Sequence, residues 1–368
     1  MNYTEQLSKQ MRNTLKSMGY DQPTPIQEQT IEPLLAGRDL FGVAQTGTGK
    51  TAAFAVPIIE GIFADNRKPQ AIVLCPTREL AMQTTEVFRK LSAHLNIRTV
   101  SVYGGQPAII QIKALRAGAQ IVVGTPGRVK DLIGRNVLKL KNIRVAVLDE
   151  ADEMLDFGFC DDIKAILSEL PEQHQTLLFS ATMNRAVMSI AKQFQNDPMS
   201  IEIGKRNEPV KTVNQTVMQI TEQQKVKAVC SLLKENDPRL TLIFCNTKIR
   251  VRSVTAMLMA QGLEVCCLHG DMRQKERDAI MRTFRNGTAK ILVATDVAAR
   301  GLDVNNIDLV VNYDIPDKTE YYIHRIGRTG RAGHSGNACT FMSPREWKKI
   351  KDIERSFNIS LKPQILAS

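Results

Sequence analysis

A glycine-rich segment, AQTGTGKT at 44–51, has the residue types and the spacing of a phosphate-binding loop. Glycines allow backbone N–H groups of a turn and of the helix after it to approach phosphate oxygens closely. We predict that Gly47 and Gly49 shape this loop. Lys50 is predicted to reach the β- and γ-phosphates of a nucleotide, and the Thr51 hydroxyl to bind Mg²⁺. An apolar run before the segment and the helix formers after it make a simple turn a poor alternative.

Carboxylates follow a later apolar run, in VAVLDEADEML at 145–155. A phosphate loop needs an acid that positions Mg²⁺, and Asp149 stands where a strand is expected to end. Glu150 is predicted to orient or activate the attacking water. Acidic residues also favour the first turn of any helix, so DEAD by itself can be explained by the start of a helix without a catalytic role. Beside the phosphate loop, the catalytic interpretation is the stronger one.

Arginines recur at every third residue in HRIGRTGRAG at 324–333. A basic solvated loop would be compatible with this spacing. The interleaved Gly327, Gly330 and Gly333 favour a functional role, because a merely soluble surface has no need of such backbone freedom. In phosphoryl transfer, one arginine at the γ-phosphate can increase the rate about a thousandfold or more.

Apolar segments that read as strands alternate with longer amphipathic stretches, which predicts an α/β protein built on mostly parallel sheets. The segments in the first half are 39–44, 71–75, 99–103, 120–124, 145–149 and 176–180. Those in the second half are 241–245, 263–269, 290–295, 308–313 and 337–341. The polar stretch around Pro209 reads as a linker. We therefore predict a domain over 1–205, a linker over 206–215 and a second domain over 216–368.

The composition is that of a globular chain of 368 residues with a formal net charge of +11. Nine of these positive charges lie after residue 210, which fits a polyanionic partner held largely by the second half. Solvated lysines on the surface explain the same excess equally well. No segment has the apolar length of a membrane span or of a signal peptide, so a cytoplasmic location is expected. Seven scattered cysteines without a C-x-x-C pair read as free thiols.

With the phosphate loop and the carboxylates in order, the chain resembles a DEAD-box RNA helicase, a branch of superfamily 2, from about residue 3 to about residue 345. The resemblance implies two tandem RecA-like domains and the cofactors ATP and Mg²⁺. GYDQPTPIQ at 19–27 resembles the adenine-reading motif. It implies that Gln27 bonds the adenine edge and that Tyr20 stacks on it, with Tyr3 as a candidate second aromatic.

The same resemblance implies contacts to the RNA backbone in both halves. Those in the first half come from PTRELA, GG and TPGR, with Thr77, Arg78, Gly105, Thr125 and Arg128. Those in the second half are Gly270, Gln274, Arg277 and Thr295. SAT, with Ser180 and Thr182, resembles the motif that couples the acid cluster to the second domain.

Residues implied to act on ATP from the second half are Asp303, His324, Arg328 and Arg331. Asp303 is expected to bind the ribose. Arg328 and Arg331 are expected to reach the γ-phosphate, and His324 to bond toward the acid cluster and SAT. Hydrolysis would then require closure of the two domains, and RNA that favours closure would couple positively to ATP.

The expected activity is therefore that of an RNA-dependent ATPase that opens short duplexes or remodels RNA–protein complexes. An ATP-gated RNA clamp needs the same motifs, and a DNA translocase of the same plan is disfavoured by AQTGTGKT, DEAD and HRIGRTGR together. Aromatic residues make up only 5% of the chain, which favours sequence-independent RNA contacts. A monomer of bacterial origin is expected. The ending LKPQILAS indicates either a minimal two-domain core or a shortened chain.

Overall fold

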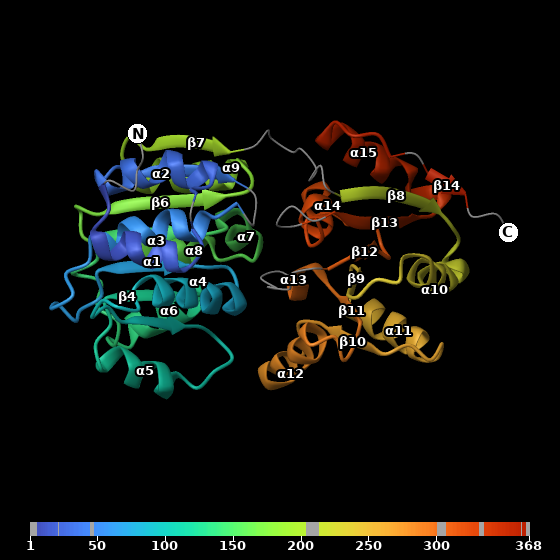
Figure 1. Cartoon of the computed structure of the whole chain (residues 1–368), viewed down its shortest axis with the longest axis horizontal. Helices are drawn as coiled ribbons and strands as arrows, with labels where there is room; N and C mark the ends of the chain where they lie inside the picture. Colours follow the sequence, from blue (N-terminus) through green and yellow to red (C-terminus); the bar gives the residue numbers. More distant parts are fainter. Residues whose placement is uncertain are drawn as a thin grey trace. The chain divides into compact units, whose positions relative to one another are not determined.

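The computed structural model describes residues 6–20, 22–44, 48–203, 213–299, 307–330, 335–361 and 363–365. The chain divides into two compact units, Met1–Gly204 and Lys205–Ser368 (Figure 1). The described residues form one seven-stranded sheet in each unit. Every strand pair recorded in both sheets is parallel. The two sheets with helices packed on them are the predicted α/β fold, and that prediction is confirmed.

The sheet of the first unit has the strand order β3-β4-β2-β5-β6-β1-β7. Its strands are β1 Leu40–Ala44, β2 Ala71–Leu74, β3 Thr99–Val102, β4 Ile121–Gly124, β5 Val145–Leu148, β6 Gln175–Ser180 and β7 Met199–Ile203. Because parallel strands all point the same way, their carboxyl ends share one edge of the sheet. That edge is where open α/β sheets bind their ligands.

Helices cover both faces of this sheet. The helices are α1 Lys9–Ser17, α2 Pro25–Leu35, α3 Lys50–Glu60, α4 Arg78–Leu91, α5 Ala108–Arg116, α6 Pro126–Gly134, α7 Ala151–Asp156, α8 Cys160–Ser168 and α9 Arg185–Phe194. Apolar side chains of α1 to α4 belong to one buried cluster, and those of α6 to α9 belong to another. Strand β2 contributes side chains to both clusters, because Val73 lies in the first cluster and Ile72 in the second.

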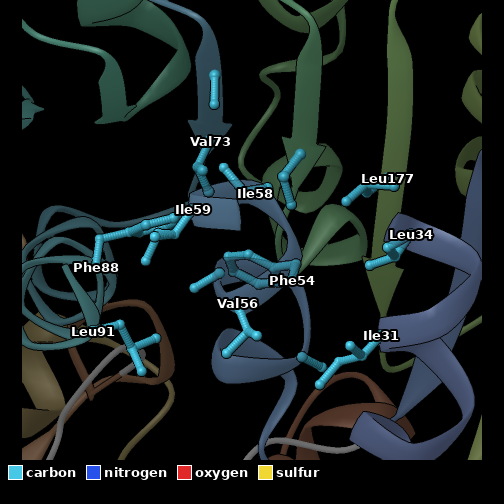
Figure 2. Packing of buried hydrophobic residues seen from close by; sticks show 14 of the residues in the cluster. Ile31, Leu34, Phe54, Val56, Ile58, Ile59, Val73, Phe88, Leu91 and Leu177 are labelled. Carbon is cyan, nitrogen blue, oxygen red and sulfur yellow. The ribbon is translucent and has the colours of Figure 1, made fainter. Parts of the chain in front are cut away.

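Phe54 anchors α3 in the first of these clusters. Its ring is fully buried, with centroids 6.2 Å from Phe88 and 5.4 Å from Phe179. Figure 2 shows Phe54 between side chains of α2, α4 and the sheet. A Cβ at Gly42 would come within 2.7 Å of the Phe179 ring, so β1 needs glycine there. This packing fixes the start of α3, and therefore Lys50, at the end of β1.

The sheet of the second unit has the order β10-β11-β9-β12-β13-β8-β14. Its strands are β8 Val213–Gln219, β9 Thr241–Phe244, β10 Val265–Leu268, β11 Ile291–Ala294, β12 Leu309–Asn312, β13 Gly336–Met342 and β14 Pro363–Ile365. Its helices are α10 Lys225–Asn236, α11 Lys248–Met259, α12 Gln274–Arg285, α13 Asp296–Ala299, α14 Thr319–Ile326 and α15 Trp347–Phe357, with short 3₁₀ turns at Glu222–Gln224 and Pro344–Glu346. Helices α12 to α15 share one buried cluster, and α10 and α11 share the other.

Three strands escaped the sequence analysis: β7, β8 and β14. All three lie at or next to one end of their sheet, and most residues of β7 and β8 are partly or fully exposed, so these strands do not form an apolar run. Residues 213–215, which the sequence places in the linker, begin β8. The rest of the predicted linker lies outside the described residues. Across the described residues, no helix combines the length and the apolar character that a bilayer span requires.

Candidate functional site

Lys50 is the first residue of α3, at the carboxyl end of β1. Gly49 before it has a φ of 93°, which glycine adopts without the steric cost of a Cβ. The Lys50 side chain is buried, and its Nζ donates a hydrogen bond of 2.9 Å to the carbonyl oxygen of Ala44. Thr51 follows in the first helical turn and is partly buried. Gly47 lies outside the described residues.

Gln27 joins the start of α2 to the phosphate loop. Its Nε2 donates to the Gly49 carbonyl at 3.3 Å, and its Oε1 accepts from the backbone N–H of Thr24 at 3.0 Å. A Cβ at Gly49 would come within 2.8 Å of both side chains, so the loop and α2 are in close contact. Tyr20 is partly buried against the core beneath α2, and Tyr3 lies outside the described residues.

Asp149 directly follows β5 and is 2% exposed. Burial raises the pKa of its carboxyl to about 6, against the opposing effect of Lys50 and with a further rise from Glu150. Among the described residues, Asp149 Oδ1 has no hydrogen-bond partner. A buried carboxylate oxygen without a donor is costly, and beside a phosphate loop it suits Mg²⁺ or a metal-bound water. The residues present therefore fit the ion.

Glu150 takes up a left-handed backbone conformation, with φ 53° and ψ 53°, immediately before α7. Such a conformation costs a residue with a Cβ about 1 kcal/mol or more and is concentrated at functional sites. The side chain is only partly buried, in contrast to that of Asp149. Two adjacent carboxylates thus have different surroundings, which suits a division of roles between them.

The SAT segment contacts the acid cluster through hydroxyl groups. Thr182 Oγ1 donates to Asp152 Oδ2 at 3.0 Å, and Ser180 Oγ donates to the Thr182 carbonyl at 2.7 Å. The backbone N–H of Thr182 donates back to Ser180 Oγ at 3.2 Å. Because Asp152 is almost fully buried, the Thr182 hydroxyl supplies a bond that its carboxylate needs. The end of β6 is therefore tied to the helix that begins after Glu150.

The residues implied to contact RNA in the first unit follow β2, β3 and β4, which are neighbours in the sheet. Thr77 and Thr125 are the N-cap residues of α4 and α6, and Gly105 has a φ of 76° in the turn after β3. The residues predicted to act on the nucleotide follow β1, β5 and β6, which are neighbours on the other side. Strand order therefore divides the carboxyl edge into one part with the candidate nucleotide residues and a second part with the candidate RNA residues.

Two arginines in the second part contact their own unit. Arg128 donates to the Gln106 carbonyl at 3.2 Å and to Gln111 Oε1 at 2.9 Å. The Arg78 guanidinium lies 4.6 Å from the ring centroid of Tyr103. Both arginines therefore contact residues of the β3–α5 region, whose turn contains Gly105. The sequence analysis did not foresee these contacts.

The corresponding residues of the second unit follow β10 and β11, which are adjacent at the end of their sheet. Gly270 is exposed, and Gln274 donates to Asp278 at 2.8 Å within α12. Arg277 Nη2 donates to the Ala298 carbonyl at 3.4 Å, which connects α12 to α13. Thr295 is partly buried and precedes α13. These four residues thus share one side of the carboxyl edge.

His324 and Arg328 lie at and beyond the end of α14. Arg328 is buried, and its Nε donates to the His324 carbonyl at 3.3 Å. Both line a small recess of the second unit together with Phe244, Asp296, Ala299, Tyr321 and Arg325. Asp303 and Arg331 lie outside the described residues. The described part of HRIGRTGRAG is therefore packed into its unit and is not a solvated basic loop.

Arg325, which sequence reasoning did not select, is the most extensively bonded arginine of this region. It is 1% exposed, and it donates to both carboxylate oxygens of Asp296 at 2.5 and 2.6 Å. Further bonds reach Asn246 Oδ1 at 2.8 Å, the Asp314 carbonyl at 2.6 Å and Asn312 Oδ1 at 3.4 Å. One guanidinium therefore joins α14 to the ends of β9, β11 and β12.

Helical spacing could have identified Arg325 as buried. It lies three residues after Tyr322 and one before Ile326, and both are fully buried. An arginine on the apolar stripe of a helix needs a carboxylate partner. Asp296, in ATDVAARGLD, was an available candidate.

Replacing Asp296 with Ala is expected to lower the free energy of unfolding of the second unit by about 3 kcal/mol, because it leaves a buried guanidinium without its counter-charge. Urea unfolding followed by fluorescence measures this, since the single Trp of the chain, Trp347, is in that unit. Asp352→Ala is the matched control. Its pair with Arg355 spans 3.9 Å between exposed side chains, so a change within about 0.5 kcal/mol is expected. Equal effects of the two variants would contradict the assigned role.

Parallel sheets of this topology, with Lys50 after β1 and paired carboxylates after β5, define a protein with two tandem RecA-like domains. Residues 24–190 match the DEAD/DEAH box helicase family, and residues 224–333 match the helicase conserved C-terminal domain. The chain belongs to the DEAD-box family of ATP-dependent RNA helicases.

Relatives and solved structures agree with this family. The chain is 46% identical to the ATP-dependent RNA helicase CshA of Limosilactobacillus reuteri, over 97% of this chain and 72% of that protein. It is 45% identical to the DEAD-box ATP-dependent RNA helicase CshA of Bacillus cereus, over 95% and 67%. The structure of S. cerevisiae Dbp5 bound to RNA and ADP BeF3 matches with a TM-score of 0.89 at 33% identity, covering 99% of this chain and 95% of that one.

Proposed function

We propose that the protein is an RNA-dependent ATPase that opens short RNA duplexes locally or remodels RNA–protein complexes. The observation that carries the proposal is the division of the carboxyl edge in the first unit. Lys50, Asp149 and Thr182 follow β1, β5 and β6, whereas the helix N-termini at Thr77 and Thr125 follow β2 and β4. One sheet can therefore present ATP and a phosphate backbone to adjacent parts of the same edge.

In the proposed reaction, each group of the nucleotide site has one role. Lys50 exchanges its bond to the Ala44 carbonyl for the β- and γ-phosphates. Asp149 and Thr51 hold Mg²⁺, which, when bound, neutralises charge that develops on the phosphate oxygens. Glu150 accepts a hydrogen bond from the attacking water and orients it toward the γ-phosphorus. Gln27 selects adenine, because its amide can pair with the base edge and it already contacts the phosphate loop.

The second unit is proposed to complete this site. Arg328 and Arg331 supply positive charge to the γ-phosphate, Asp303 binds the ribose, and His324 bonds toward the acid cluster and Thr182. Since these residues and Lys50 belong to different units, hydrolysis requires both units to engage one nucleotide. RNA held by both units favours the same arrangement, so ATP and RNA are expected to bind with positive coupling.

RNA is proposed to be held through its phosphates and 2′-hydroxyls, without sequence preference. The candidate residues lie at helix N-termini and tight turns, which suit phosphate oxygens whatever the base. The net charge of +11 supports such binding. A monomeric state and a cytoplasmic location belong to the same proposal, and sedimentation of the chain with RNA and cell fractionation test them.

Steady-state ATP hydrolysis with and without single-stranded RNA tests the function. We expect strong stimulation by RNA, weaker stimulation by matched DNA, and loss of both in Lys50→Ala. Equal rates with and without RNA would contradict the proposal. Where RNA stimulates, strand displacement on a short duplex separates a helicase from a clamp that holds RNA with little unwinding.

Replacing Gln27 with Ala is expected to raise the KM for ATP by about tenfold or more, since a buried amide that bridges α2 and Gly49 is lost. The preference for ATP over GTP should fall as well, which competition between the two nucleotides measures. Gln29→Ala, an exposed glutamine on the same helix, is the matched control and should leave KM unchanged. A normal KM and normal nucleotide preference in Gln27→Ala would remove this residue from the site.

A further inference from the structure

Trp347 exposes a large aromatic surface on the second unit, outside every part of the candidate site. It begins α15 and is 40% exposed, whereas Ile350, Ile353 and Phe357 of the same helix are buried. A single exposed apolar side chain is ordinary on a protein surface, so the residues around this ring decide whether it has a role. An indole is also the side chain best suited to stack on a flat ring.

Three basic residues lie close to this indole in the chain, and one of them contacts its ring. Lys351 Nζ lies 4.8 Å from the ring centroid, one helical turn after Trp347. Arg345 and Lys348 are exposed, and neither has an ion-pair partner within the described part of the chain. We call Arg345, Trp347, Lys348 and Lys351 the Trp347 surface. Lys351 lies over one part of the ring and pairs with Glu354 at 2.6 Å, so the unpaired charges of this surface, among the described residues, are those of Arg345 and Lys348. An exposed aromatic ring with two such cations next to it in the chain is complementary to a base with its phosphates.

Helix α15 connects to the carboxyl edge of its unit through polar contacts of Lys349, which is not part of the Trp347 surface. Lys349 Nζ pairs with Asp317 Oδ1 at 3.3 Å, and the same oxygen accepts from Asn246 Nδ2 at 3.2 Å. Asn246 lies just after the carboxyl end of β9, next to β11 with Thr295. Figure 1 shows α15 beside the β8 end of this sheet and α12 beside the β10 end. The surface therefore lies apart from the candidate RNA residues but within the same unit.

We propose that the Trp347 surface is a second RNA-binding site, which takes a single-stranded part of the RNA beyond the segment held at the carboxyl edge. A base stacks on the indole of Trp347, and the flanking phosphates contact Arg345 and Lys348. The inference rests on the proposed function for its ligand. It adds a place where a longer RNA gains affinity without contributing to the chemistry at the nucleotide site.

Fluorescence of the full chain tests the proposal, because Trp347 is its single Trp. Single-stranded oligouridylates of increasing length are titrated, with RNA-stimulated ATP hydrolysis measured in parallel. Long strands are expected to quench the fluorescence, whereas the shortest strands that still stimulate hydrolysis are expected to leave it unchanged. The quenching should weaken as salt is raised.

Variants measured by anisotropy of labelled RNA identify the contacts. Trp347→Ala is expected to weaken binding of long strands by about tenfold, and Trp347→Phe, which keeps a ring, by less. The double variant Arg345→Glu with Lys348→Glu should reduce the slope of log affinity against log salt concentration by about one for each phosphate contact that is lost. The matched control is the double variant Lys227→Glu with Lys234→Glu, which changes two exposed lysines on α10. It should bind long strands almost as tightly as the unaltered chain, with only the small loss of affinity that any removal of positive charge causes.

Two results would overturn the proposal, and only the second of them would also overturn the proposed function. If long strands stimulate hydrolysis but neither quench Trp347 nor bind Trp347→Ala less tightly, the surface is not an RNA site and the proposed function stands. If RNA neither binds nor stimulates the unaltered chain, the proposed function fails and the second site fails with it. Normal ATP hydrolysis by Trp347→Ala on short strands excludes misfolding as the cause of weaker binding.

Discussion

Glu150→Gln is expected to lower kcat for RNA-stimulated ATP hydrolysis by at least about a hundredfold, because a positioned general base contributes about 10² to 10⁴ in rate. The amide has nearly the shape of the carboxylate but accepts a proton poorly. Binding of ATP should be nearly unchanged, since the phosphates are held by Lys50 and the loop. Steady-state kinetics with a fluorescent ATP analogue as a binding probe separates kcat from affinity.

Glu172→Gln is a suitable control for this variant. Glu172 is an exposed carboxylate of the same unit, outside the carboxyl edge, and no change in kcat is expected from it. Retention of more than about a tenth of the normal kcat by Glu150→Gln would show that another group orients the water. Loss of ATP binding instead would mean that the left-handed conformation at Glu150 had been disturbed, and circular dichroism would detect an accompanying loss of folding.

Arg328→Ala is expected to lower kcat by about a thousandfold, since an arginine finger contributes about 10³ to 10⁵ in phosphoryl transfer. Arg328 is buried beside the His324 carbonyl, so its guanidinium is already oriented before ATP binds. RNA affinity without nucleotide should stay normal, whereas the gain in RNA affinity that ATP produces should shrink. Kinetics and RNA binding with and without a non-hydrolysable ATP analogue measure both effects.

Two further variants complete this experiment. Arg239→Ala removes an exposed arginine from the same unit and should leave kcat unchanged. Arg328→Lys keeps the positive charge but lacks the planar guanidinium group, so its kcat should be only slightly higher than that of Arg328→Ala. Activity of Arg328→Ala within tenfold of normal would place the catalytic arginine elsewhere in HRIGRTGRAG, with Arg331 as the residue to replace next.

Central strands could be predicted from the sequence because both faces of a parallel sheet are covered. Residues such as those of β2 and β9 are buried throughout, so they appear as short uninterrupted apolar runs. The outer strands β7, β8 and β14 carry polar residues, and their place in the sheet depends on a partner strand far away in the chain. Pairing of β8 with β13, for instance, joins Val213 to Gly336.

The sequence by itself was enough to predict the phosphate loop and the DEAD carboxylates, because the chemistry proposed for them depends on spacing within a few residues of one strand end. Only the tertiary structure decided which groups surround them. It leaves Asp149 Oδ1 without a partner, connects Gln27 to Gly49, and places Arg325 against Asp296. Burial and pairing of charges depend on neighbours from separate strands, and local spacing carries no information about those neighbours.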